Sequence, residues 1–312
     1  MNNFTEIQKV VNDIKDIKIQ WATNIAKAGI LILSKEIKRQ KFWSIKEFNI
    51  FLQKAIGIIR SARATEPMLF NGISKLQATC WMLKANKKIN IQILQNRLSD
   101  SCLDYIKEIE KEEKIRPIIG AKLIKNWYNI MTHCHSWSVV RALSMAWKQW
   151  KKFHVYNTET RPLYQWRKTS RDLLAVWIPD TMITDDAAPF FVDNLYESHV
   201  NIDMVLIGCD TIKLDGSIYN KIWSFAIALS AWHAGIPVYI VGSLTKVDEE
   251  NKVEIEKRAG SELWPEAPKW LEIINYAFDM VPAKFITWII TEYGIIKPQD
   301  IKKYVKKYYP RF

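Results

Sequence analysis

The sequence predicts an α/β fold in which an N-terminal helical domain precedes a Rossmann-like domain with a mainly parallel sheet. In the first part of the chain, apolar residues recur at spacings of three and four, as on one face of a helix. From about Gly120 onward, short apolar runs alternate with helical segments, which is typical of βαβ units. We therefore expect a helical domain over residues 1–119 and a Rossmann-like α/β domain over residues 120–312.

Three segments of the first part carry helix signals. The first has an apolar stripe made of Phe4, Ile7, Val11 and Ile14. The second begins at a capping box of Ser44 and Glu47, and its stripe continues to Ile59. The third runs from Ser101 to about Glu113, and the residues expected to face inward are Leu103, Ile106 and Ile109.

Four short apolar runs of the second part predict strands: Tyr128–Met131, Phe153–Tyr156, Met204–Ile207 and Val238–Val241. Ligands of parallel sheets bind beyond the carboxyl ends of the strands, so the polar residues after each run deserve inspection. Those residues are His133 to Ser136, Thr158 to Pro162, Gly208 to Asp210, and Gly242 and Ser243 with Lys246. We expect all four groups to converge on one crevice.

The composition is that of a folded protein with a basic surface. Hydrophobic residues make up 48% of the 312, and Lys+Arg exceeds Asp+Glu by 45 − 33 = 12. This charge suits an anionic ligand, but the lysines are scattered and lie in no nucleic-acid-binding motif, so we expect no nucleic-acid partner. No apolar run approaches the about 18 residues of a membrane span, and the N-terminus does not resemble a signal peptide. We expect a cytoplasmic protein without a membrane segment.

The four cysteines form no CxxC pair, which argues against zinc binding and disulfides and suits a reducing compartment. One of them, Cys134, lies between His133 and His135 at the end of the first predicted strand, and a helical pattern follows at once. Thiolate character rises near helix N-termini and positive groups, so Cys134 is a candidate reactive thiol. The alternative is a structural cysteine with two incidental histidines.

A series of motifs in the second part resembles one protein family. In order they are THCHS, VYNTETRPLYQWR, IPDTMITDDAA, IDMVLIGCDTIKLDGSIYNKI, IPVYIVGS and AFDMVPAKFITWIITEYGIIKP, with thinner matches in IKIQWATNIAKA and SARATEPMLFNGI. The chain is therefore identified as a member of the family that holds ribose 1,5-bisphosphate isomerase, methylthioribose-1-phosphate isomerase and the regulatory subunits of initiation factor 2B. The isomerases carry a cysteine and an aspartate that the initiation-factor subunits typically lack, and here these are Cys134 and Asp210.

The resemblance implies an aldose–ketose isomerase, and THCHS, the short loops and the C-terminal sequence are most similar to the ribose 1,5-bisphosphate enzymes. Opening an aldose 1-phosphate ring, removing the C2 proton and delivering one to C1 requires an acid and a base, and neither a metal nor another cofactor. The resemblance assigns Cys134, as thiolate, to take the C2 proton and Asp210 to protonate the ring oxygen. Asp210 then needs a raised pKa, which an apolar pocket can supply; a turn-capping aspartate is the alternative.

Phosphate binding is likewise implied by the resemblance. Gln20, Trp21 and Ala22 stand where the family has an Arg-Gly-Ala-like turn entering a helix, and Arg63 is placed to clamp a phosphate. The remaining expected substrate-binding residues are Ser136, Gln165, Asn220, Lys221 and Lys246. Two departures, the uncharged Gln20 and an Asp186 in place of a small polar residue, put the affinity of the first phosphate site in question.

The resemblance also bears on partners and alternatives. It implies a sugar-phosphate substrate, a homo-oligomer (dimer or hexamer) associating through the α/β domain, and a nucleotide (AMP) as candidate activator. In the family this reaction links nucleotide degradation to ribulose-bisphosphate carboxylase. The alternatives are a methylthioribose-1-phosphate isomerase and a regulatory subunit that binds its ligand without turnover.

Tryptophan and glycine occur in unusual proportion. The chain has 14 tryptophans and 10 glycines, or about 3% glycine against a usual level of about 7%. Seven tryptophans fall at or next to expected turns, most where the family pattern has glycine: Trp21, Trp127, Trp150, Trp166, Trp177, Trp223 and Trp288. We hypothesise that the gene reads UGA as glycine and was translated as if UGA meant tryptophan. The alternative is a divergent, inactive relative whose phosphate-binding turns are filled.

Overall fold

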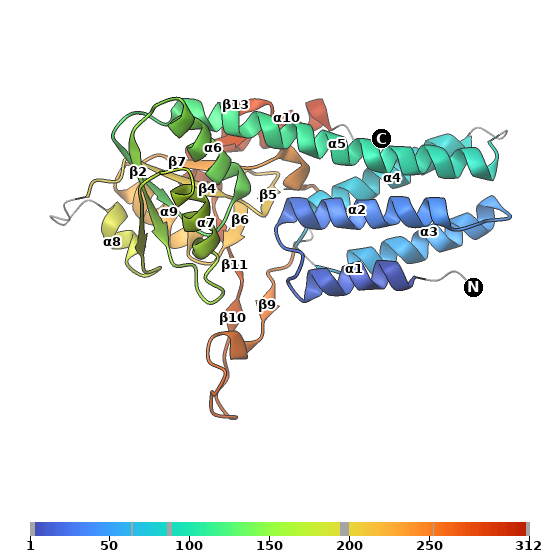
Figure 1. Cartoon of the computed structure of the whole chain (residues 1–312), viewed down its shortest axis with the longest axis horizontal. Helices are drawn as coiled ribbons and strands as arrows, with labels where there is room; N and C mark the ends of the chain where they lie inside the picture. The colour runs from blue at the N-terminus through green and yellow to red at the C-terminus, as the bar shows by residue number, and fades with distance from the viewer. Residues whose placement is uncertain (1–3, 64, 86–88, 194–199, 252, 310–312) are drawn as a thin grey trace. The chain divides into compact units, whose positions relative to one another are not determined.

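The computed structural model describes residues 4–63, 65–85, 89–193, 200–251 and 253–309 (Figure 1). The chain forms two compact units that divide within one long helix, α5 (Ile91–Leu123), between Lys111 and Glu112. The predicted assignment of domains to 1–119 and 120–312 stays a prediction. Among the described residues, none of the helices is both long enough and apolar enough to cross a bilayer.

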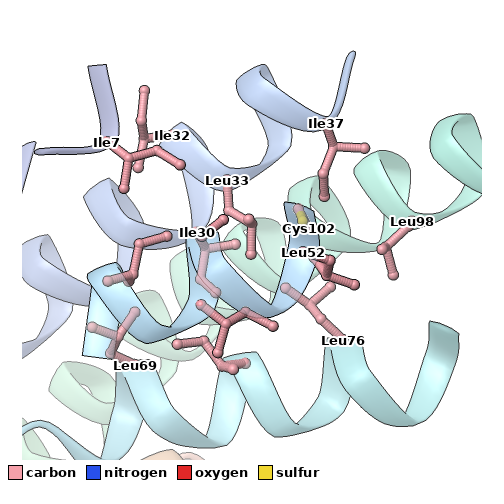
Figure 2. Close-up of a cluster of buried hydrophobic side chains, with 14 of the residues drawn as sticks. Ile7, Ile30, Ile32, Leu33, Ile37, Leu52, Leu69, Leu76, Leu98 and Cys102 are labelled. Carbon is pink, nitrogen blue, oxygen red and sulfur yellow. The ribbon is translucent and has the colours of Figure 1, made fainter. Parts of the chain in front are cut away.

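The first unit is a helical bundle. It consists of α1 (Thr5–Lys15), α2 (Ala22–Arg39), α3 (Ile45–Arg60), α4 (Pro67–Ala85) and the beginning of α5. Figure 2 shows how side chains from each of these helices meet in one apolar core, among them Ile30, Leu52, Leu76 and Leu98. Because each helix contributes one apolar stripe to a shared centre, packing rather than intrinsic propensity stabilises these helices.

The three predicted helices are present, two of them nearly as expected. The first is α1 and the second is α3, where the Ser44 hydroxyl accepts a hydrogen bond from the backbone N–H of Glu47 at 3.1 Å. The third is the middle of the much longer α5, and its buried face differs from the prediction. Ile109 is buried as expected, but Leu103 and Ile106 are only half-buried. The buried stripe consists of Leu98, Cys102, Tyr105 and Ile109.

The second unit is built on a seven-stranded sheet of order β13-β12-β7-β4-β1-β2-β3. Its strands are β1 (Tyr128–Thr132), β2 (Phe153–Thr158), β3 (Asp180–Ile183), β4 (Met204–Gly208), β7 (Val238–Val241), β12 (Trp288–Thr291) and β13 (Gly294–Ile296). All neighbours are parallel except β12 and β13. The predicted α/β fold with a mainly parallel sheet is confirmed, and so are all four predicted strands.

Helices cover both faces of this sheet. Neighbouring strand residues alternate between two apolar clusters: Met131 and Ile289 face one side, whereas Ile130 and Ile290 face the other. The end of α5, α6 (Trp137–Lys148) and α7 (Trp166–Leu174) pack on the side of Ile130. On the opposite side are α8 (Ala188–Val192), α9 (Ser224–His233) and α10 (Ile301–Tyr308). Burial on both faces explains why the strands read as continuous apolar runs.

Two smaller sheets complete the second unit. A four-stranded sheet has the order β11-β6-β5-β8, with β5 (Thr211–Lys213), β6 (Ile218–Lys221), β8 (Val247–Asp248) and β11 (Phe278–Val281). The antiparallel pair β9 (Lys257–Arg258) and β10 (Asn275–Tyr276) lies beyond it (Figure 1). The β5–β6 hairpin directly follows Asp210, so the small sheet braces the carboxyl end of β4.

Candidate active site

The site lies where the order of the large sheet reverses. From β1 the chain continues to β2 and β3 on one side, whereas β4 pairs with β1 on the other side. Such a reversal opens a crevice at the carboxyl ends of the two central strands. Cys134 follows β1 and Asp210 follows β4, so the topology places both predicted catalytic residues at this point.

Cys134 has an unusual backbone conformation that its neighbours hold. Its φ is 65°, a left-handed value that is uncommon for residues other than glycine. Its N–H donates to Thr160 Oγ1 at 3.0 Å, and its carbonyl oxygen accepts from the Thr169 hydroxyl at 3.0 Å. Cys134 is also the one cysteine of the four that is partly exposed, since Cys80, Cys102 and Cys209 are buried. The left-handed backbone thus places the one partly exposed cysteine at the crevice.

The thiol is protonated in this environment at neutral pH. Burial raises the pKa of Cys134 to about 11, and the negative charges of Asp210 and Asp185 act in the same direction. The buried ammonium group of Lys221 opposes them by stabilising the thiolate. Lys221 is therefore the positive group that favours ionisation of Cys134.

The two flanking histidines are structural and uncharged. Burial lowers the pKa of His133 and of His135 to about 4. His133 Nε2 donates to the carbonyl oxygen of Ile222 at 2.7 Å, which leaves Nδ1 to accept from the Thr158 hydroxyl. His135 Nδ1 bonds Thr169 Oγ1 at 3.0 Å. The sequence pattern suggested that the imidazoles polarise the thiol. In the structure His133 instead connects the ends of β1, β2 and β6, and His135 bonds Thr169 of α7.

Asp210 begins the hairpin after β4 and is partly exposed. Its backbone N–H donates to the carbonyl oxygen of Tyr219 at 2.9 Å, which secures it to the small sheet. Two residues before it, Gly208 allows a close approach: a Cβ there would lie 2.6 Å from Ser136 Oγ. Ser136 is the N-cap of α6, and its side chain makes no capping hydrogen bond. The loops after β1 and β4 are therefore in direct contact.

The other predicted binding residues of the second unit lie on neighbouring segments. Lys246, in the turn after β7, donates from Nζ to the carbonyl oxygen of Cys209 at 2.5 Å. Asn220 and Lys221 are buried at the end of β6, where the Asn220 amide donates to Ser224 Oγ at 2.8 Å. Gln165 is the N-cap of α7, and its Oε1 is buried without a hydrogen-bond partner among the described residues.

The predicted residues of the first unit surround the start of α2. Ala22 is its first residue, and Trp21 is the N-cap with φ 68° and ψ 135°. The Gln20 amide donates to the carbonyl oxygen of Ile17 at 2.8 Å. Arg63 pairs with the buried Glu66, with 3.2 Å between Nη1 and Oε1. Their predicted role in phosphate binding stays a prediction.

Two residues of the site, Thr169 and Asp185, escaped the sequence reasoning, whereas Thr160 lies in the predicted segment Thr158 to Pro162. Both oxygens of the Asp185 carboxylate accept backbone N–H groups, from Thr160 at 2.8 Å and from Arg161 at 2.7 Å. Asp185 is buried, whereas the adjacent Asp186, noted from the sequence as a departure, is exposed. The position of Asp185 after β3 was a usable signal, since that strand also ends at the crevice, whereas Thr169 lies within α7. Among the described residues, no group of three His, Cys, Asp or Glu side chains is arranged to hold a metal ion.

Curated relatives carry two names. The chain is 30% identical over 302 residues to the ribose 1,5-bisphosphate isomerase of Thermococcus kodakarensis, covering 94% of this chain and 91% of that protein. The enzyme of the same name from Methanocaldococcus jannaschii is 30% identical, with 99% and 97% covered. The methylthioribose-1-phosphate isomerase of Acetivibrio thermocellus is 31% identical, with 97% and 92% covered.

Solved structures share the fold. The 5-methylthioribose 1-phosphate isomerase of Pyrococcus horikoshii aligns with a TM-score of 0.76 at 24% identity, covering 97% of this chain and 87% of that one. The translation initiation factor eIF-2B of the same organism aligns with a TM-score of 0.76 at 22% identity, covering 94% and 97%. A sequence profile of the initiation factor 2 subunit family matches residues 18–298. The chain thus belongs to the initiation factor 2 subunit (IF-2B) family.

Proposed function

We propose that this protein is an aldose–ketose isomerase that converts ribose 1,5-bisphosphate to ribulose 1,5-bisphosphate. The observation that carries the proposal is the pairing of Cys134 and Asp210 across the switch point of the sheet, with the buried Lys221 beside the thiol. An isomerisation of this kind requires a base for C2 and an acid for the ring oxygen. Relatives named for this reaction are similar over nearly the whole chain, which supports the same conclusion.

In the proposed reaction Asp210 gives a proton to the ring oxygen, and the bond between that oxygen and C1 breaks. The Cys134 thiolate then takes the proton from C2, and the electron pair of the C–H bond forms a double bond between C1 and C2. Delivery of a proton to C1 and loss of the C2 hydroxyl proton leave a ketone at C2. Because the resting thiol has a pKa of about 11, the reactive thiolate is a minor form at neutral pH.

We assign phosphate recognition to residues on the segments that follow the central strands. The hydroxyl of Ser136, which makes no capping hydrogen bond, lies at the N-terminus of α6, where backbone N–H groups favour an anion. Lys221, Lys246, Asn220 and Gln165 belong to the segments around the same strand ends. On the resemblance alone, Arg63 and the turn of Gln20, Trp21 and Ala22 in the first unit are also proposed to bind phosphate. No cofactor enters the proposed chemistry.

Two observations motivate alternative functions. A relative with the methylthioribose-1-phosphate name is as similar as those with the bisphosphate name, and that substrate carries an apolar thioether at C5. The basic residues Lys221 and Lys246 favour the bisphosphate, because a second phosphate needs cationic partners. Fold neighbours that are initiation-factor subunits motivate the second alternative, a regulatory protein that binds a sugar phosphate without turnover.

The test is turnover of both sugar phosphates by the wild type, Cys134→Ser and Asp210→Asn, with Cys80→Ser as matched control because Cys80 lies in the other unit. Conversion of the bisphosphate, lost in both variants and kept in the control, supports the proposal. Conversion of the thioether sugar alone moves the function to the methylthioribose reaction. Binding of either sugar without conversion contradicts an enzymatic role.

Assembly and regulation belong to the same proposal. A homo-oligomer, a dimer or hexamer, follows from the family, and one fold neighbour comes from a tetrameric complex. Light scattering with and without AMP measures the assembly, and the same turnover assay with AMP measures activation. A monomer that AMP leaves unchanged in rate contradicts both expectations.

A further inference from the structure

We infer that the native residue at positions 21, 127, 150, 177 and 223 is glycine, encoded by UGA codons that the source lineage reads as glycine. The first observation concerns the backbone. Among the described residues, ten non-glycine residues have positive φ, and five of them are tryptophan, with φ from 64° to 84°. Tryptophan supplies only 14 of the 312 residues. Bulky residues rarely adopt this conformation, whereas glycine adopts it readily.

The second observation is a helix-ending motif that occurs three times among the described residues of the second unit. In this motif two backbone N–H groups fold back on the last turn, and the residue between helix and strand takes positive φ. At the end of α9 that residue is Gly235, with φ 72°. Its N–H bonds the carbonyl oxygen of Trp232 at 3.2 Å, and the next N–H, of Ile236, bonds that of Ala231 at 2.8 Å.

The same hydrogen bonds recur at the end of α6, with tryptophan in the glycine position. Trp150 N–H bonds the carbonyl oxygen of Trp147 at 2.9 Å, and Lys151 N–H bonds that of Ala146 at 3.3 Å. Trp150 has φ 65°. Its side chain is 84% exposed, so it gains little from burial in return for the strained backbone.

The end of α7 repeats the arrangement. Trp177 N–H bonds the carbonyl oxygen of Leu174 at 3.0 Å, and Ile178 N–H bonds that of Leu173 at 3.1 Å. Trp177 has φ 64° and is 85% exposed. The same helix-ending motif therefore has glycine at its positive-φ position in one copy and an exposed tryptophan there in the other two. Neither packing nor backbone preference accounts for tryptophan at the two sites.

The other positions agree in conformation. Trp127, in the turn before β1, has φ 68° and is 80% exposed. Trp223, the N-cap of α9, has φ 84°, and Trp21 combines φ 68° with ψ 135°, outside the left-handed helical well. Two of the seven positions suspected from the sequence gain no such support. Trp166 is the first residue of α7 and Trp288 lies in β12, and neither has positive φ.

The decisive test determines the codons of the gene and the peptide masses of the natural protein. UGA at the five codons, with peptides from the source cells whose masses contain glycine there, is the expected result. UGG at codons 150 and 177, or peptides with tryptophan there, overturns the inference. In that case the exposed Trp127, Trp150 and Trp177 are native residues on the segments that precede the adjacent strands β1, β2 and β3.

A stability measurement tests the physical premise. Trp150→Gly and Trp177→Gly should each raise the Tm by about 2 °C or more, because left-handed strain is relieved. Gly235→Trp should lower the Tm through its positive φ, since a Cβ there would meet no atom within 4 Å. Trp270→Gly is the matched control, because Trp270 is 92% exposed without positive φ. A fall in Tm for Trp150→Gly and Trp177→Gly contradicts the premise.

A second inference rests on a different observation and on the proposed function: Thr160 and Asp185 are positioning residues for Cys134. Cys134 N–H donates to Thr160 Oγ1, and Thr160 N–H donates to the carboxylate of Asp185. These residues follow β1, β2 and β3 in turn, and both Thr160 and Asp185 are buried. The relay therefore ties the left-handed backbone of Cys134 to two further strand ends.

The test compares one substitution that keeps the hydroxyl with one that keeps the shape but removes it. Thr160→Ser keeps the acceptor oxygen and should retain activity, whereas Thr160→Val loses it and should lower kcat by about 10²-fold with little change in KM. Asp185→Asn should lower kcat and also shift alkylation of Cys134 to lower pH, because a negative charge that opposes the thiolate is removed.

The alkylation measurement separates this inference from the proposed function. If the wild type turns over neither sugar, Thr160→Val should still change the alkylation rate of Cys134, since the thiol is held by the same hydrogen bond. Wild-type kcat together with a wild-type alkylation profile in Thr160→Val overturns the positioning role. Equal losses in Thr160→Ser and Thr160→Val overturn it as well.

Discussion

Arg116 and Glu292 form a buried ion pair that joins α5 to the residue after β12, with 3.3 Å between Nη1 and Oε2. Glu112 lies 3.7 Å from the same guanidinium group, and the Ser243 hydroxyl donates to the Glu112 carboxylate at 2.8 Å. Ser243 follows β7, three residues before Lys246. The network therefore anchors the turn that carries a proposed phosphate ligand.

Replacing Arg116 with Met should destabilise the second unit strongly. The substitution leaves two buried carboxylates without their cation, and breaking a buried pair in this way costs about 3–5 kcal/mol. Urea unfolding followed by circular dichroism measures the loss. Lys107→Met is the control: Lys107 pairs with Asp104 on an exposed helix surface, and such pairs contribute about 0–1 kcal/mol. Similar losses in the two variants would contradict the network's importance.

Glu112 should make stability depend on pH. Burial, followed by the charge of Glu292, raises its pKa from 4.5 to about 7. The folded state therefore holds this proton more tightly than the unfolded state, so the contribution to stability is lost as pH rises from about 4.5 to about 7. The Tm of Glu112→Gln, in which this side chain cannot ionise, should fall less than that of the wild type over this pH range. Parallel Tm curves for the two proteins would disprove the assignment.

Lys221 should set the reactivity of Cys134. Removing its charge in Lys221→Met raises the pKa of the thiol further, so alkylation at a pH of about 8.5 should slow by about threefold or more. Peptide mass spectrometry after a brief iodoacetamide pulse measures the rate at Cys134 alone. Lys213→Met, on the neighbouring hairpin strand β5, is the control and should leave the rate unchanged. A faster reaction in Lys221→Met would refute the electrostatic role.

The capping box at α3 should contribute to the stability of the first unit. Ser44→Ala removes the acceptor for the Glu47 N–H and should cost about 1 kcal/mol. Ser61, at the other end of α3, donates its hydroxyl to the carbonyl oxygen of Ile58 on an exposed surface. Ser61→Ala should change the unfolding free energy by less than about 0.5 kcal/mol. Thermal unfolding of both variants tests the difference.

Local sequence patterns determined which elements form. The four predicted strands, the capping box at Ser44 and the helix after Cys134 were all visible, because period and capping are properties of neighbouring residues. The buried face of α5 was not visible in the sequence. Leu103 and Ile106 have the apolar character of a core position, yet Cys102 and Tyr105 are the ones that are buried. Partners from α2 and α4 decide which side of α5 faces inward, and those lie far away in sequence.

Some features of the candidate site could likewise be predicted from the sequence, whereas others required the structure. The sequence alone pointed to Cys134, Asp210 and Lys221, because motif spelling and strand ends can be read along the chain. Only the tertiary structure showed that His133 and His135 are neutral connectors and that Thr160 and Asp185 hold Cys134. Protonation and positioning depend on burial and on contacts between strand ends some 25 residues apart, which no local pattern encodes.

The inference about the tryptophans needed both the sequence and the folded structure. Their number against that of glycine, 14 to 10, was a property of the sequence and raised the suspicion of recoding. Only the folded backbone separated Trp150 and Trp177, in left-handed helix ends, from Trp166 and Trp288, in ordinary conformations. Composition records only which residues a chain contains. The φ angle of each residue is imposed by the hydrogen bonds of the fold, so the requirement for glycine at a position appears only in the folded structure.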